Sequence, residues 1–194
     1  MNLKSLARYD ISSDNQFVID VNIPGPDDLF EKFDENASFY KKDLNSEFLR
    51  YLLECVDEIG LKNKFMIRIG LPENQAKDTD EGDIAFSFKQ YFEYSIFLCK
   101  KEIKTVSFRL LLHVALAITT LLLMVTFNVA DTIHAAGLLS LVGSGLPAAV
   151  WVLLLTGLSR FLFRLMTQRA QIKIYRALKN TPVEFCYNEK QKDI

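Results

Sequence analysis

The hydrophobic pattern of the chain is dominated by two long apolar runs, at residues 110–129 and 137–158. The first is interrupted only by His113, Thr119, Thr120, Thr126 and Asn128, and the second, GLLSLVGSGLPAAVWVLLLTGL, contains no charged residue. A helix rises about 1.5 Å per residue, so roughly 20 apolar residues cross a hydrocarbon core about 30 Å thick. Each run is long enough, and the pattern predicts two transmembrane helices joined by a short polar hinge.

Shorter periodic segments before the first run predict a small α+β domain. Residues 17–23 (FVIDVNI) alternate apolar and polar side chains and end at a Pro-Gly-Pro turn, which predicts a strand. Residues 44–61 place apolar side chains three and four positions apart, with Asp43 available as N-cap and Gly60 as C-cap, which predicts an amphipathic helix. Residues 65–71 (FMIRIGL) predict a second strand, and the order strand, helix, strand implies a parallel pair.

The end of the chain predicts a third strand, because residues 183–187 (VEFCY) follow Pro182. A two-stranded sheet is marginal and a small domain has a small core, so we expect this strand to return to the N-terminal sheet. The predicted fold class is an α+β membrane protein, in which a small βαβα domain is closed by a C-terminal strand and carries a two-helix transmembrane hairpin. The predicted parts are residues 1–105 (α+β domain), 106–163 (hairpin) and 164–194 (basic amphipathic helix and returning strand).

Basic side chains flank the two apolar runs on one side only. Four lie between residues 100 and 109, six lie between residues 160 and 179, and the hinge contains none. The positive-inside rule therefore predicts that both termini and the α+β domain are cytoplasmic. Residues 159–179 mix apolar and basic side chains, which predicts an interfacial helix that prolongs the second span. The side chains expected to contact anionic lipid headgroups are Arg160, Arg164, Arg169 and Lys173.

The near-zero net charge of the chain conceals an asymmetry. Residues 1–99 hold 19 acidic and 11 basic side chains, a net charge of −8, whereas residues 100–194 hold 5 and 12, a net charge of +7. Binding of nucleic-acid phosphates needs clustered Lys and Arg on the recognition surface. We therefore expect no nucleic-acid partner, because the N-terminal domain is acidic and the basic residues have a topological explanation.

Two surfaces are candidates for association with a protein partner or a second copy of the chain. Residues 84–97 contain six aromatic side chains, and a helix packed on a small sheet buries the face through Ile84, Phe88 and Tyr91, while the other rings need a separate partner. In the second span small residues recur every fourth position, which favours either packing on the first span or self-association. The candidate interface residues are Phe86, Tyr94, Phe97, Ser140, Ser144 and Ala148.

Sequence signatures of catalysis are absent. The chain has no Walker loop, GxGxxG, GxSxG, HExxH or kinase motif. Its three cysteines lack CxxC spacing and its two histidines lie in or beyond the predicted spans, so we expect no metal site and no cofactor. Residues 78–83 faintly resemble a calcium loop, but Lys89 occupies the position of the bidentate Glu and helix capping explains the acidic run better. Asp20 and Glu184 could meet on a sheet face, yet this pair alone does not allow a nucleophile or a general base to be assigned.

Five segments are informative together: PDDLFEKFDE, KKDLNSEFLRYLLECVDEIG, MIRIGLPE, SFKQYFEYSIFLCKKEIK and IYRALKNTPVEF. In them the chain, from roughly residue 17 to 185, resembles a recurrent group of uncharacterised bacterial two-span membrane proteins. The resemblance implies a bacterial inner-membrane location and supplies no activity or functional residue. We expect a non-enzymatic membrane anchor or subunit whose cytoplasmic domain binds a partner or self-associates. The alternatives are an oligomeric pore-forming effector gated by that domain and, after it, a small membrane-surface enzyme.

Overall fold

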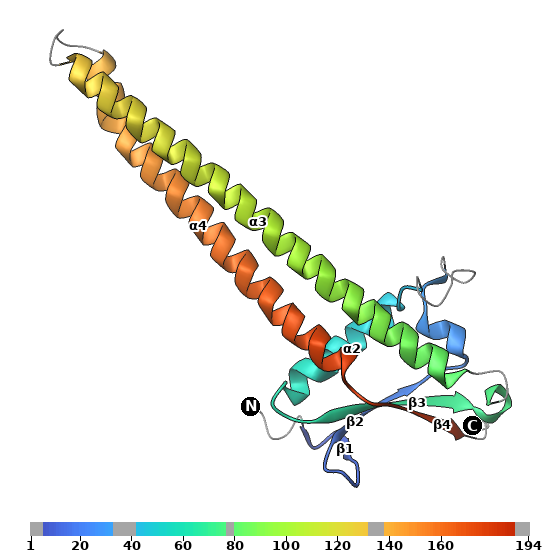
Figure 1. The fold of residues 1–194 in the computed structure, drawn as a ribbon. Helices are drawn as coiled ribbons and strands as arrows, with labels where there is room; N and C mark the ends of the chain where they lie inside the picture. The colour runs from blue at the N-terminus through green and yellow to red at the C-terminus, as the bar shows by residue number, and fades with distance from the viewer. Residues whose placement is uncertain (1–5, 33–41, 77–79, 132–137, 189–194) are drawn as a thin grey trace. The chain divides into compact units, whose positions relative to one another are not determined.

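The computed structural model of the chain describes residues 6–32, 42–76, 80–131 and 138–188, with side chains described outside residues 124–149 and 188. It is an α+β structure with a four-stranded mixed sheet and three α-helices, two of which are long and apolar (Figure 1). The chain divides into two compact units. The first consists of Met1–Phe97 with Gln171–Ile194, and the second is Leu98–Ala170.

The sheet of the first unit has the strand order β1–β2–β3–β4. β1 (Asp10–Ile11) is antiparallel to β2 (Phe17–Asn22), and β2 is parallel to β3 (Phe65–Pro72). β4 (Val183–Asn188) is parallel to β3 on the other side. The predicted parallel pair and the predicted return of the C-terminal strand to the N-terminal sheet are both confirmed. The two long helices therefore lie, in sequence, within the connection between two adjacent parallel strands.

Helix α2 (Ser46–Ile59) connects β2 to β3 and matches the predicted amphipathic helix to within two residues at each end. Its N-cap is Asn45, whose side-chain oxygen accepts from two backbone N–H groups of the first turn at 2.9 and 3.4 Å. The expectation of an Asp43 cap was wrong, because the helix starts two residues later. Gly60 ends the helix as predicted, with a φ of 79° that other residues rarely adopt. Two short 3₁₀ segments, η1 (Pro26–Leu29) and η3 (Glu73–Gln75), follow β2 and β3.

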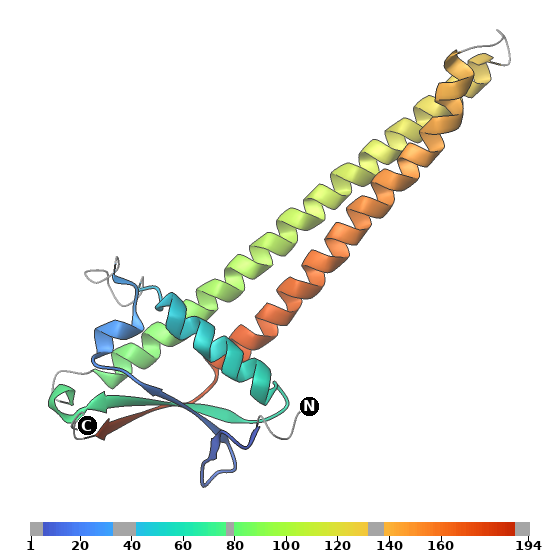
Figure 2. The same cartoon turned by 180° about the vertical axis from the view of Figure 1, so that it is seen from behind.

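Helical segments cover one face of the sheet: α2, the first turns of α3 (Glu81–Asp131) and the last turns of α4 (Leu138–Lys179) (Figure 2). The core side chains that each element contributes include Ile19, Ile67, Leu52, Phe92 and Leu178, none more than 3% exposed. Within this unit α3 and α4 also contact each other, because the Phe92 ring stacks on Tyr175 at 6.1 Å and Lys179 Nζ lies 3.0 Å from Glu93 Oε2. The start of α3 and the end of α4 are thus part of the domain core.

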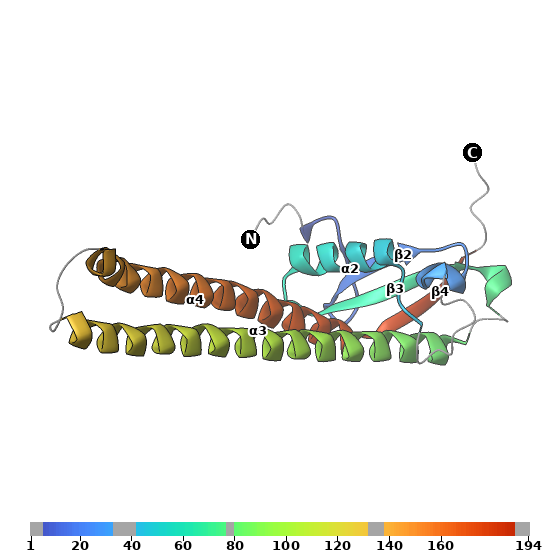
Figure 3. The ribbon, with the colours of Figure 1, turned by 90° about the horizontal axis from the view of Figure 1, so that it is seen from above.

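Helices α3 and α4 are each continuous, over 51 and 42 residues. The aromatic segment accordingly runs into the first apolar run, and the basic segment prolongs the second apolar run as predicted. In the second unit the two helices lie side by side (Figure 3). Within the described part of the chain, Glu81–Leu123 and Val150–Lys179 are long and apolar enough to cross a membrane by length and composition.

Candidate functional site: an apolar hairpin with a basic pocket

The second unit exposes large apolar side chains along both of its helices. Only 6% of the most apolar stretch of α3 and 11% of that of α4 are buried. In α3 the exposed side chains are Phe108, Leu111, Leu112, Val114, Leu116, Ile118, Leu121, Leu122 and Leu123. In α4 they are Trp151, Val152, Leu153, Leu155, Leu158, Leu162, Phe163 and Met166. The core helix of a soluble protein would instead bury most of such a stretch.

The two helices bury small and medium side chains where they face each other. Ala117 is 2% exposed and Val150 is 5% exposed. At Gly157 a side chain would crowd His113, since a Cβ built there lies 3.3 Å from both Cβ and Cγ of His113, closer than most real Cβ contacts. The absence of a side chain at Gly157 therefore allows the two backbones to approach closely, as small residues do between apolar helices.

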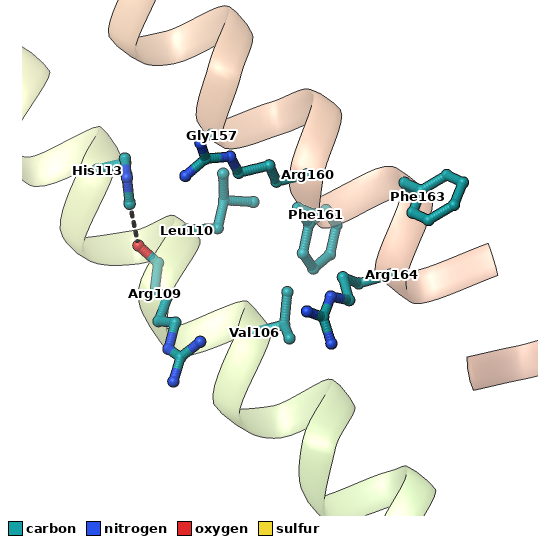
Figure 4. A pocket seen from close by; sticks show the side chains of 9 residues that line it. All are labelled: Val106, Arg109, Leu110, His113, Gly157, Arg160, Phe161, Phe163 and Arg164. Carbon is teal, nitrogen blue, oxygen red and sulfur yellow. Dashed lines mark hydrogen bonds between the residues drawn. The ribbon is translucent and has the colours of Figure 1, made fainter. Parts of the chain in front are cut away.

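A pocket of about 390 Å³ lies between α3 and α4 at the end of the hairpin where the basic residues begin (Figure 4). Its polar lining residues are Arg109, His113, Arg160 and Arg164. Val106, Leu110 and Phe161 supply an apolar side to the same pocket. The described residues that line it include no carboxylate. The pocket thus combines an excess of positive charge with apolar surface.

His113 is held in a defined orientation by the turn of α3 that precedes it. Its Nδ1 lies 2.7 Å from the backbone carbonyl oxygen of Arg109. A carbonyl oxygen can only accept a hydrogen bond, so Nδ1 must carry the proton and donate it. With Gly157 against one side, the imidazole ring forms a fixed wall of the pocket. The sequence alone does not mark His113 as a site residue, because its contact with Gly157 depends on the register of the two helices.

Glu102 forms the boundary of the basic region. Its two carboxylate oxygens accept from Arg164 Nη1 at 2.7 Å and from Gln168 Nε2 at 2.6 Å. Arg164 is 60% exposed, and an exposed ion pair of this kind contributes about 0–1 kcal/mol to stability. Gln168 is only 8% exposed, so its bond to Glu102 is the more consequential one. Nearby, burial raises the pKa of the Cys99 thiol, and the negative charge of Glu102 raises it further, which disfavours the reactive thiolate form.

The four side chains predicted to contact lipid headgroups have different surroundings. Arg160 and Arg164 come together at the pocket, whereas Arg169 and Lys173 are exposed farther along α4. Within the described part of the chain, Arg109 and Arg160 take part in no ion pair. Positive charge is therefore concentrated at the pocket, whereas the charges of Arg169 and Lys173 are spread over the exposed surface of α4.

The aromatic segment of α3 is divided between core and surface. Its buried apolar side chains are Ile84, Phe88 and Phe92, four residues apart, so the core face is rotated from the predicted one. Tyr91 is half-buried as a result. Tyr94 and Phe97 are 55% and 58% exposed, and their rings stack on each other with centroids 6.3 Å apart.

The remaining candidate interface residues add little to this surface. Phe86 is half-buried, so Tyr94 and Phe97 form the exposed part of the aromatic cluster. The side chains of Ser140, Ser144 and Ala148 lie outside the part that the structure describes. An interface through these three small residues therefore stays a prediction.

The carboxylates considered for catalysis do not face each other. Asp20 on β2 and Glu184 on β4 both lie opposite Arg68 of the strand between them. Arg68 pairs with Asp20 at 3.4 Å, so a basic residue on the strand between them separates the two carboxylates. The acidic run before α3 acts as a cap, since Asp80 Oδ1 accepts from the Asp83 backbone N–H at 3.1 Å. Among the described residues no group of His, Cys, Asp and Glu is placed to hold a metal ion.

A second hollow, of about 470 Å³, lies in the first unit at the end of β2. Its acidic lining residues are Asp20, Asp28 and Glu47. Tyr51 borders it and donates its hydroxyl proton to the Asp20 carbonyl oxygen at 3.1 Å. Burial raises the pKa of Tyr51, so its phenol stays protonated. The described lining holds no Ser, Cys, His or Lys, and a nucleophile beside a base is not assembled there.

No family model, no curated protein and no solved structure matches the chain. The resemblance to bacterial two-span membrane proteins therefore stays a prediction, and the function has to be argued from the physical properties of the molecule.

Proposed function

We propose that the chain is a non-enzymatic integral membrane protein. Its helical hairpin anchors an α+β domain at the cytoplasmic face of the membrane, and that domain binds a protein partner or a second copy of the chain. On the sequence resemblance, the membrane is the bacterial inner membrane.

The exposure of the apolar hairpin carries this proposal. Nine large apolar side chains of α3 and eight of α4 are exposed between residues 108 and 166. Leaving one such side chain in water instead of burying it costs roughly 1.5–3 kcal/mol, so the total is on the order of tens of kcal/mol. A domain is stable by only about 5–15 kcal/mol, and the hairpin is therefore incompatible with full exposure to water. In the hydrocarbon core of a bilayer every backbone N–H and C=O group has to be hydrogen-bonded within the protein, and two continuous helices meet this requirement.

The distribution of Lys and Arg supports the orientation. Four basic side chains precede the first apolar run, six follow the second, and the connection between the runs has none. Basic residues of this kind are retained on the cytoplasmic side during insertion. Both termini and the sheet are then cytoplasmic.

The construction of the domain supports a role as an anchor with a binding surface. Helix α3 begins in the domain core and α4 ends there. Each helix therefore connects the domain to one apolar run without a break. The Tyr94–Phe97 pair offers the partner an exposed aromatic surface next to this core. Aromatic side chains in such a position are the typical centres of protein interfaces.

The polar side chains of the hairpin favour an anchor over a pore. The hydroxyl groups of Thr119 and Thr120 donate at 2.9 Å to the carbonyl oxygens of Ala115 and Leu116, in their own helix. Hydroxyl protons used in this way are not available to water in a channel. We rank a pore second, because its polar lining would have to come from other residues of the hairpin, whose side chains lie outside the part that the structure describes.

Extraction of the full chain from membranes tests the proposal. We expect it to stay in the membrane fraction at alkaline pH in carbonate and to require detergent for release. Native mass measurement after mild-detergent purification should then show a defined dimer or a complex with another protein. Release by carbonate would contradict membrane integration. Leakage of ions from vesicles that contain the purified chain would instead favour the pore.

A further inference from the structure

The basic pocket of the hairpin carries more positive charge than the ion pairs of its lining residues neutralise. Three arginines line it, and in the part of the chain that the structure describes their one ion pair joins Arg164 to Glu102. Three positive charges and one negative charge leave a net charge of +2, with His113 counted as neutral. An anionic group is therefore attracted to the pocket, and phosphate oxygens, like those of a carboxylate, match the donors of the guanidinium fork.

The side chains of α4 reach across the pocket toward α3. Figure 4 shows Arg160 extending toward His113 and Leu110, while Arg164 extends toward Val106. In this view the Arg109 guanidinium extends away from α4, so among the three arginines that line the pocket it is the least well placed to contact a bound anion. Arg160 is consequently the side chain best placed to bind a phosphate, with Arg164 as the second donor.

The apolar side of the pocket indicates what carries the phosphate. Leu110 and Phe161 line it beside the arginines, and Phe163 at its edge is 74% exposed. The exposed leucines of α3 continue from there along the apolar run. A free phosphate ion would use only the basic half of this surface, whereas an amphiphile would use both halves.

We propose that this pocket binds one anionic phospholipid, with its phosphate on Arg160 and Arg164 and its acyl chains along the exposed apolar face of the hairpin. The inference rests on the proposed function, since a lipid reaches the pocket from a bilayer that the hairpin spans. It goes beyond general attraction to headgroups, because it assigns a single site with a defined stoichiometry to a pocket between two helices.

The test is a titration of the full detergent-solubilised chain with phosphatidylglycerol, followed by native mass spectrometry. The wild type should retain one lipid per chain in preference to phosphatidylcholine. Arg160→Gln should weaken retention about tenfold or more, as expected for loss of a charge-assisted bidentate contact. The matched control is Arg169→Gln, which removes the same charge from an exposed position on the same helix, outside the pocket, and should leave retention within about twofold.

Two further variants separate the site from structural damage. Arg160→Lys keeps the charge but loses the planar fork, so its affinity should fall between that of the wild type and that of Arg160→Gln. Glu102→Gln releases Arg164 from its ion pair, so this variant should bind the lipid more tightly than the wild type. Misfolding would not produce a gain in affinity.

Each contrary result has a distinct meaning. Equal losses in Arg160→Gln and Arg169→Gln would overturn the site and leave only general electrostatic attraction. Displacement of the lipid by an equal concentration of inorganic phosphate would show that the pocket recognises the anion alone and would overturn the lipid assignment. A chain that binds no lipid but still needs detergent for extraction would overturn this inference while the membrane anchor stands, whereas release by carbonate would overturn the anchor itself.

Discussion

Gly157 of α4 lies directly against the side chain of His113 on α3. A Cβ at position 157 would be 3.3 Å from His113 Cβ and Cγ, which is closer than most real Cβ contacts. On the other side of the ring, the Nδ1 proton is bonded to the Arg109 carbonyl oxygen. The imidazole therefore cannot rotate away without breaking that bond, and the contact fixes how closely the two helices approach at the basic end of the hairpin.

A larger side chain at this contact should separate the helices. We expect Gly157→Leu to lower the stability of the hairpin by about 1–3 kcal/mol, as overpacking of a close contact does. Thermal unfolding in detergent micelles measures the effect. His113→Ala should restore most of the loss in the double variant, because it removes the group with which the leucine collides. Val152→Leu, at a position that is 63% exposed, is the control and should change little.

The exposed aromatic pair should be dispensable for folding but required for association. Replacing both Tyr94 and Phe97 with Ser is expected to weaken the dimer or complex about tenfold or more, because aromatic side chains at interface centres contribute several kcal/mol. Sedimentation or native mass measurement in mild detergent gives the change. Far-ultraviolet circular dichroism should stay as in the wild type.

A buried ring from the same helix is the matched control for the aromatic pair. Phe92 is 0% exposed, so Phe92→Ala should destabilise the domain itself by about 3–5 kcal/mol. If the Tyr94 and Phe97 variant lost its folded signal and protease resistance in the same way, these rings would belong to the core and the proposed binding surface would be wrong.

Alkaline pH should weaken the packing of β4 through Tyr187. Its hydroxyl donates to Glu81 Oε1 at 2.8 Å, and burial, with the Glu81 carboxylate, raises the pKa of Tyr187 from 10.0 to about 12. The folded state therefore favours the neutral phenol, whose contribution is complete below pH 10 and is lost as the pH rises to about 12.

The comparison of wild type with Tyr187→Phe isolates this contribution. The difference in denaturation midpoint between the two should be constant below pH 10 and shrink toward pH 12, since the variant has no phenol to ionise. Glu81→Gln should reduce the pH dependence of the difference, because it removes the carboxylate charge. A difference that stays constant over the whole interval would show that the Tyr187 bond is absent in solution.

Glu102 should stabilise the hairpin mainly through Gln168. Glu102→Ala leaves Nε2 of the nearly buried Gln168 amide without its acceptor. Oε1 of the same Gln168 amide already has no hydrogen-bond partner among the described residues. We expect a loss of about 1–3 kcal/mol. Gln168→Leu in the same background should recover stability, since it removes the unsatisfied amide. A double-mutant cycle by thermal unfolding measures the coupling, and independent, additive effects would contradict it.

Periodicity in the sequence was sufficient to predict the main elements of the sheet unit. The strand at residue 17, the helix that follows it and the returning strand at residue 183 have a local apolar pattern, and the strand at residue 65 is a short apolar run that is buried almost throughout. β1 (Asp10–Ile11) was not predicted, because two residues are too few to show alternation. The core face of the aromatic segment was also misplaced by one position. Six closely spaced rings fit more than one helical face, and contact with Tyr175, distant in the sequence, selects the face that contains Phe92.

The pocket shows the limit of sequence reasoning for the candidate site. Two of its arginines, Arg160 and Arg164, were predicted to meet lipid headgroups, since charge at the end of an apolar run is visible in the sequence. Which of them come together depends on the register of α3 against α4. Glu102 and Arg164, which are 62 residues apart, meet only through that register, and no local pattern reports it.

The central claim, a hairpin that spans the membrane with both termini and the sheet in the cytoplasm, is tested most directly by labelling single introduced cysteines in intact cells. The impermeant reagent should react with a cysteine at Asp131, at the end of α3 beyond the first apolar run, and should spare cysteines at Lys4 and Gln191 until the cells are opened. Reaction at Lys4 or Gln191 in intact cells, with Asp131 protected, would contradict the account.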